Sequence, residues 1–136
     1  MSRILAIDYG QKRVGLAVSD SKQIIASGLT TVHSKDVMSF LKQYLSKEPV
    51  SAFVVGEAKN LDNTPAESTR FIEPFVRRLL KEFPDIPIHR VDERFTSKMA
   101  FQTMIDSGLK KKARRNKALI DKISATIILQ SYLDSL

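Results

Sequence analysis

Acidic residues stand at positions from which they could act together on one substrate. Asp8 follows the apolar run at residues 4–7, Asp92 and Glu93 follow the strand expected at residues 86–91, and Asp121 lies in the last apolar segment. Mg²⁺ and Mn²⁺ bind such carboxylates in sites where two cations activate water and stabilise a leaving oxygen. An ionised carboxylate at the end of a buried strand also needs a positive partner, because burying it alone costs several kcal/mol. The pattern therefore indicates metal-assisted hydrolysis of a phosphodiester.

Each carboxylate also has a simpler interpretation, in which it only supports the fold. Asp8 could accept hydrogen bonds from nearby backbone N–H groups, because Asp-x-Gly is common turn chemistry. Glu93 could pair with Arg90 or Arg94 at the surface. Asp121 could form a structural ion pair with a neighbouring lysine or with an arginine from elsewhere in the chain.

The charge balance is strongly basic and favours a polyanionic partner. The 136 residues include 22 Lys and Arg against 15 Asp and Glu, a net charge of +7. Such a balance is typical of proteins that bind nucleic acid. Six of the basic residues fall within eight positions: Lys110, Lys111, Lys112, Arg114, Arg115 and Lys117. This tract predicts salt-dependent contacts with phosphates, although a solvated loop would have the same composition.

Composition excludes several classes of protein. A chain with 43% hydrophobic and 27% charged residues is ordinary for a folded protein, and 136 residues fit one domain, residues 1–136. Cysteine is absent, which removes disulfides, thiolate metal sites and cysteine nucleophiles. No apolar run approaches the roughly 18 to 20 residues that cross a bilayer, and the N-terminus has no signal-peptide pattern. We therefore expect a cytoplasmic protein without a membrane partner.

The elements that must position these residues follow from periodicity and capping. Pro74 should bend or divide the second helix, and the last helix is apolar nearly all round and should be largely buried. The order of strands and helices along the chain predicts an α/β fold, in which three antiparallel strands and two parallel strands form one sheet. The carboxyl ends of the parallel strands would lie at one edge of that sheet, where we expect the site. The expected strands are residues 3–9, 14–20, 24–32, 50–55 and 86–91, and the expected helices are residues 36–47, one beginning at Thr64, 96–107 and 117–134.

Five sequence blocks resemble the YqgF/RuvX family, in family order and over nearly the whole chain. They are Ile7-Asp8-Tyr9-Gly10, Arg13-Val14-Gly15-Leu16-Ala17-Val18-Ser19-Asp20, Val54-Val55-Gly56, Val91-Asp92-Glu93-Arg94-Phe95-Thr96-Ser97 and Ile120-Asp121-Lys122-Ile123-Ser124-Ala125. The resemblance implies a ribonuclease H-like three-layer fold with a mixed five-stranded sheet, related to RuvC-type Holliday junction resolvases. It also implies a metal-dependent nuclease that matures the 5′ end of 16S ribosomal RNA precursors.

Carried over by motif, the catalytic and metal-binding set is Asp8, Glu93 and Asp121, with Mg²⁺ or Mn²⁺ as cofactor. Arg94 and Lys98 could steady the scissile phosphate beside the basic tract. The chain departs from the family in the loop at residues 57–63, where the usual Leu-Pro and a later glycine are missing. This departure concerns substrate contacts of that loop and not the acidic set.

Several functions remain compatible with these residues. The leading hypothesis is an endonuclease on structured RNA, with pre-rRNA and the assembling small ribosomal subunit as partners. The same chemistry on branched DNA, as in Holliday junction resolution, is the alternative within the enzyme class. A nucleotide-binding protein of the sugar-kinase, Hsp70 and actin type would need two such domains, and a non-catalytic nucleic-acid-binding module would use the basic tract alone. Symmetric junction cutting requires a two-fold dimer, and no exposed apolar stripe clearly provides one, which favours a monomer.

Overall fold

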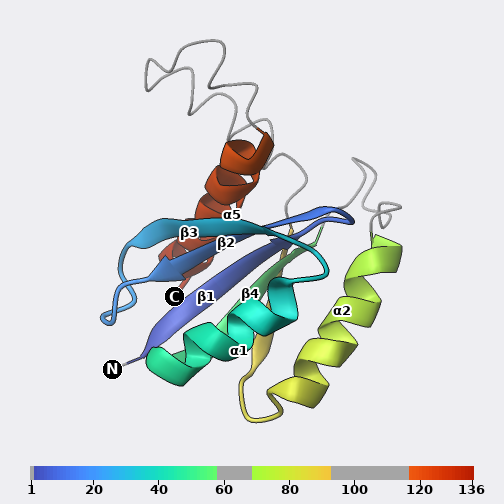
Figure 1. Cartoon of the computed structure of the whole chain (residues 1–136). Coiled ribbons are helices and arrows are strands. Elements are labelled where there is room, and N and C mark those ends of the chain that lie inside the picture. Colours follow the sequence, from blue (N-terminus) through green and yellow to red (C-terminus); the bar gives the residue numbers. More distant parts are fainter. Residues whose placement is uncertain (1, 58–68, 93–116) are drawn as a thin grey trace.

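The computed structural model describes residues 2–57, 69–92 and 117–136, and these residues build one sheet with helices on both faces (Figure 1). The strands lie side by side in the order β3-β2-β1-β4-β5. Within this part of the chain, no helix is long and apolar enough to span a membrane. The elements are β1 (Arg3–Tyr9), β2 (Arg13–Ser19), β3 (Ala26–His33), α1 (Val37–Lys47), β4 (Val50–Glu57), α2 (Thr69–Glu82), β5 (Ile88–Asp92) and α5 (Lys117–Asp134).

The sheet is mixed, as the sequence predicted. β1 pairs antiparallel with β2, and β2 pairs antiparallel with β3. On its other side β1 pairs parallel with β4, which pairs parallel with β5. The carboxyl ends of β1, β4 and β5 therefore lie at one edge of the sheet, together with the start of β2.

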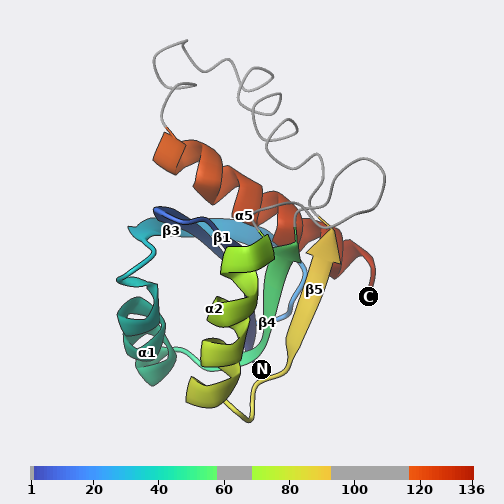
Figure 2. The ribbon, with the colours of Figure 1, turned by 90° about the vertical axis from the view of Figure 1, so that its right-hand side faces the viewer.

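Two helix layers enclose the sheet, which confirms the three-layer arrangement (Figure 2). The side chains of β1 alternate between them, because successive residues of a strand point to opposite faces. Leu5 and Ile7 belong to the core on the side of α1 and α2, whereas Ile4 and Ala6 belong to the core beneath α5. Tyr9 continues the first set, since its ring stacks on Phe75 of α2 at 4.4 Å between centroids.

The last helix, α5, is largely buried, as expected: among its residues 119–133, Ser131 alone is exposed. Its inner residues Ala125, Ile128 and Leu129 are no more than 1% exposed. On the outer side, Ile123 and Ile127 remain half-buried. The inner side is the more deeply buried because the sheet supplies its packing surface.

Pro74 does not divide the second helix, because α2 runs continuously from Thr69 to Glu82. Pro74 itself is exposed, whereas Ile72, Phe75 and Leu79 are buried against the sheet. A proline inside a helix costs about 3 kcal/mol, and burying each large apolar side chain returns about 1.5–3 kcal/mol. The N-cap expected at Thr64 and the helix expected at residues 96–107 lie outside the described residues.

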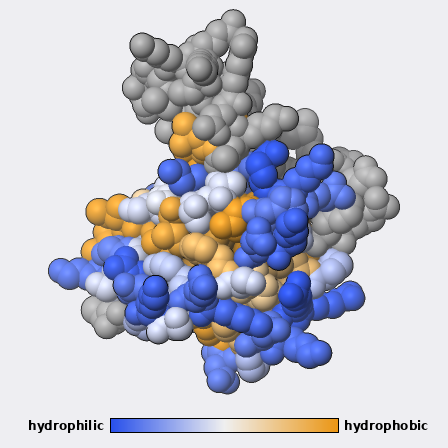
Figure 3. All heavy atoms as spheres, viewed as in Figure 1, coloured by the Kyte–Doolittle hydropathy of each residue, from blue (hydrophilic) through white to orange (hydrophobic). Residues whose placement is uncertain are grey.

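The third strand begins at Ala26, two residues later than predicted, because Ile24 and Ile25 belong to a turn. Asp20 Oδ1 accepts hydrogen bonds from both of their backbone N–H groups, at 2.8 and 2.9 Å. Gln23 adopts the left-handed conformation, with φ of 59°. Ile24 and Ile25 are consequently 60% and 61% exposed. The rest of the viewed surface is mainly hydrophilic, with smaller hydrophobic patches between charged side chains (Figure 3).

Candidate active site

Asp8 lies near the carboxyl end of β1, on the face of the sheet that α5 covers. Its side chain continues the alternation of Ile4 and Ala6, whose neighbours include Ala125 and Ile128 of α5. Asp8 is half-buried, and it takes part in an interaction within the protein. Its partner in the sheet is Gly15 of β2, so their Cα atoms are about 5 Å apart.

Gly15 is the point at which α5 meets the sheet. A Cβ atom at this position would overlap the backbone carbonyl of Asp121 and would stand 3.1 Å from the backbone nitrogen of Lys122. Only glycine permits a helix backbone to approach a strand this closely. Because Gly15 is also the sheet partner of Asp8, this contact brings Asp121 next to Asp8.

Arg13 supplies a positive charge to the same place. It is the first residue of β2 and precedes Gly15 by two positions, so both lie on the α5 side of the sheet. Its Nε donates a hydrogen bond of 2.7 Å to Oδ2 of Asp121, 108 residues away in sequence. The Arg13 side chain is 42% exposed and that of Asp121 is 22% exposed. The structure therefore confirms the simpler interpretation of Asp121, in which its carboxylate pairs with an arginine from elsewhere in the chain.

The remaining predicted site residues lie outside the described part of the chain. β5 ends at Asp92, whose sheet partner is Glu57, the last residue of β4. Arg90 of the same strand donates a hydrogen bond of 2.8 Å to Glu73 of α2. Outside the described residues are Glu93, Arg94, Lys98, Lys110, Lys111, Lys112, Arg114 and Arg115, together with most of the loop at residues 57–63.

The described donors suit a hard divalent cation. Asp8 and Asp121 offer carboxylate oxygens, the ligands that Mg²⁺ and Mn²⁺ prefer, at a half-buried position. Ser124, one turn further along α5, is 1% exposed, and its Oγ has no hydrogen-bond partner in the described structure. Among residues 2–57, 69–92 and 117–136, no group of three or more His, Cys, Asp or Glu side chains could hold a metal ion. A complete cation site would need a further ligand from outside these residues.

The interpretation of single residues missed the roles of Arg13 and Gly15. Gly15 had a usable signal, since a glycine inside an apolar strand often marks a close approach of another backbone. Arg13 had none, because nothing local to an exposed arginine at a strand start indicates a partner 108 residues away.

The chain matches a known family along almost its whole length. The sequence model of the RuvX family, described as Holliday junction resolvase, matches residues 2–135. The chain belongs to the RuvX family. A relative in Flavobacterium psychrophilum is 62% identical over 133 residues, covering 98% of this chain and 97% of the relative. One in Phocaeicola vulgatus is 60% identical over 135 residues, covering 99% and 97%. Both relatives carry the name "Putative pre-16S rRNA nuclease".

Solved structures show the fold of this RuvX protein to be ribonuclease H-like. RuvC of Thermus thermophilus in complex with a Holliday junction substrate has a TM-score of 0.59 at 17% identity, covering 99% of this chain and 98% of that one. A second structure of RuvC from the same organism has a TM-score of 0.57 at 18% identity, covering 98% and 95%. The family to which the chain belongs is one of nucleases.

Proposed function

We propose that this chain is one domain that works as a metal-dependent endonuclease on structured nucleic acid, and that its substrate is the 5′ region of pre-16S rRNA. The observation that carries the proposal is the contact of α5 with Gly15, which brings Asp121 beside Asp8 at the edge where β1, β4 and β5 end. Ligand sites of open α/β sheets collect at this edge. Membership of the RuvX family and the names of its relatives support the reaction and the RNA substrate.

Asp8, Asp121 and Glu93 would hold Mg²⁺ or Mn²⁺. A bound divalent cation lowers the pKa of water and stabilises charge on the phosphoryl oxygens. The register supports the inclusion of Glu93, because Ile7 pairs with Val55 and the next residue of β4, Gly56, pairs with Val91. Asp8 and Val91 thus stand in one row across β1, β4 and β5, about 10 Å apart, and Glu93 follows two residues after Val91.

The overall reaction is a displacement at phosphorus. The oxygen of water bonds to the phosphorus, the bond from phosphorus to the 3′-oxygen breaks, and that oxygen takes a proton. Arg94 and Lys98 would steady the scissile phosphate, and the tract at residues 110–117 would bind the neighbouring backbone. The net charge of +7 supports a polyanionic substrate, and we expect the protein to act in the cytoplasm on the assembling small ribosomal subunit.

The test compares two aspartates at opposite edges of the sheet. Wild type, Asp8→Asn and Asp20→Asn are incubated with a 5′-extended rRNA precursor fragment, with Mn²⁺ or with EDTA. Asp8→Asn should lose at least about 100-fold in cleavage rate, because a metal ligand is lost. Asp20→Asn makes the same chemical change in a turn and should stay within about twofold. Equal rates for Asp8→Asn and wild type would refute the assignment of Asp8.

A four-way DNA junction belongs in the same experiment, because the family is described as Holliday junction resolvase. Cutting confined to the junction would move the proposal to branched DNA and would require a two-fold dimer. Binding of both substrates without cleavage of either would favour a nucleic-acid-binding module.

A further inference from the structure

Arg13 contacts the same carboxylate of Asp121 that a divalent cation would bind. The ion pair is short, at 2.7 Å, and it uses one oxygen, Oδ2, of a carboxylate that is 22% exposed. An arginine and a divalent cation seek the same lone pairs of a carboxylate. The two positive groups also repel each other when they share one ligand. Arg13 and a cation bound by Asp121 are therefore competitors.

The geometry of Arg13 indicates that the contact can be exchanged. The guanidinium donates through Nε, and within the described structure its two terminal amino groups make no hydrogen bond that would anchor it further. The side chain is 42% exposed, so water can replace the carboxylate as its partner. An exposed ion pair of this kind contributes little to stability. Breaking the ion pair of Arg13 therefore requires little free energy, whereas a cation bound between two carboxylates would gain two ligands at once.

Asp121 has a reason to need this partner before a cation arrives. The contact at Gly15 brings the Asp121 backbone beside Asp8, so two acidic residues lie close together on the α5 face of the sheet, and like charges that approach each other disfavour the charged forms. Lys12, the neighbour of Arg13, is exposed on the same turn, and within the described residues it forms no ion pair with Asp121. Arg13 is the described cation that contacts the Asp121 carboxylate.

We propose that Arg13 is a positioning residue that holds the Asp121 carboxylate in the metal-free protein and is displaced when a divalent cation binds. This inference rests on the proposed function, because it takes Asp121 to be a metal ligand. Arg13 thereby sets the concentration of cation at which the site fills. Arg13 also holds the Asp121 carboxylate in place until the cation takes over the position of the guanidinium.

The experiment measures Mn²⁺ binding by electron paramagnetic resonance, on the intact protein and without nucleic acid. Arg13→Gln should tighten Mn²⁺ binding about fivefold, the factor that corresponds to a partly exposed ion pair. Lys12→Gln removes the same charge from the adjacent position and should change the dissociation constant less than twofold. Arg13→Lys keeps the charge and should restore binding close to that of wild type. Circular dichroism on each variant verifies that the protein measured is folded.

The outcomes separate this inference from the proposed function. Asp121→Asn should abolish the Mn²⁺ binding that Arg13→Gln strengthens, so the signal of free Mn²⁺ should stay undiminished. If wild type binds Mn²⁺ through Asp121 and Arg13→Gln binds it equally or more weakly, the competition is refuted while the metal site stands. An equal gain from Lys12→Gln would also refute it, because the effect would then be general electrostatics. Absence of Mn²⁺ binding in wild type and all variants would refute both the competition and the proposed metal site.

Discussion

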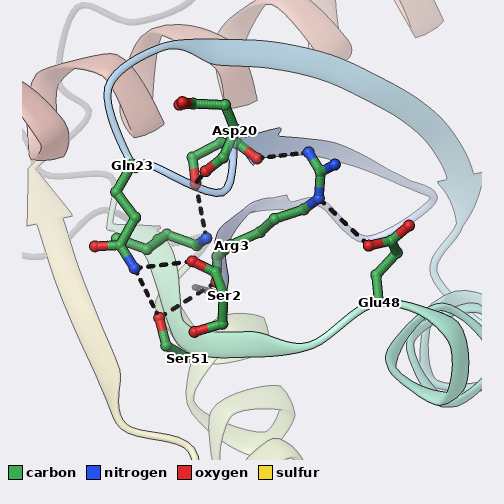
Figure 4. Close-up of polar contacts among 8 residues, drawn as sticks. Ser2, Arg3, Asp20, Gln23, Glu48 and Ser51 are labelled. Atoms are coloured by element: carbon green, nitrogen blue, oxygen red, sulfur yellow. Dashed lines mark hydrogen bonds and ion pairs between the residues drawn. The ribbon is translucent and has the colours of Figure 1, made fainter.

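The two edges of the sheet both carry charged groups, but they use them differently. At the edge where β1 and β4 begin, the charged side chains form hydrogen bonds with nearby backbone or ion pairs with one another (Figure 4). Arg3 donates from Nη1 to the carbonyl of Ser19 at 3.0 Å and pairs with Glu48 at 3.5 Å. Asp20 accepts backbone hydrogen bonds from Lys22 and Ile24 as well as from Ile25. Each charge there completes a turn or a strand end.

The opposite edge brings charges together that local structure does not need. Arg13, Asp8 and Asp121 come from two strands and a helix, and the hydrogen bond from Arg13 to Asp121 joins residues 108 apart. Asp121 reaches this place only because Gly15 lacks a side chain. A charge paired with adjacent backbone thus stabilises the fold, whereas charges that come together from distant elements indicate a site. Substitutions at the two edges should therefore affect different measurements.

The largest effect on stability is expected where the helix meets the sheet. Gly15→Ala should lower the free energy of unfolding by about 3 kcal/mol, because its Cβ meets rigid backbone and α5 must move. Gly28→Ala is the control on the neighbouring strand: its Cβ would meet side chains and not backbone, at 2.8 Å from Lys122 Cγ and 3.2 Å from Thr126 Oγ1. That change should stay within about 1 kcal/mol. Urea denaturation measures both, and equal effects would contradict the assigned contact.

The two arginines provide the next test of the comparison. Arg3→Gln should cost about 1 kcal/mol of stability, because it loses a hydrogen bond to the Ser19 carbonyl and its pairing with Glu48. Its Mn²⁺ affinity should equal that of wild type. Arg13→Gln should cost at most about 1 kcal/mol and, unlike Arg3→Gln, should change Mn²⁺ affinity. Reversal of this pattern would show that the edges had been assigned the wrong way round.

The smallest effect concerns pH. Backbone hydrogen bonds from Ile25 and Ile24 hold the pKa of the Asp20 carboxyl below its ordinary value of 3.8. A lowered pKa in the folded state adds stability above the ordinary value, and this is lost as pH falls through the folded pKa. Asp20→Asn should therefore have a lower Tm than wild type at pH 7, with the gap closing below about pH 4.

Thermal unfolding followed by circular dichroism from pH 7 to pH 2.5 measures this gap. Asp85→Asn, a change at an exposed position, is the control for net charge. A gap for Asp20→Asn that stays constant with pH would mean that the carboxylate charge does not stabilise the turn.

Much of the fold could be predicted because it follows from short-range patterns. The alternation of apolar residues located the strands to within a few residues, and the order of elements indicated the mixed sheet. The errors have local causes as well. Asp20 accepts hydrogen bonds from the N–H groups of Ile24 and Ile25, so the third strand begins only at Ala26. In α2, the burial of Phe75 and Leu79 outweighs the free-energy cost of Pro74 within the helix.

The sequence by itself determined that Asp8 lies near the end of the first strand and that Asp121 lies on the last helix, because strand and helix periodicity depend on neighbouring residues. Motif order indicated the RuvX family. Tertiary structure alone decided that Arg13 is the partner of Asp121 and which side of α5 is buried against the sheet. An ion pair depends on distance in space, and the close approach at Gly15 that sets this distance exists only once the helix has packed on the sheet.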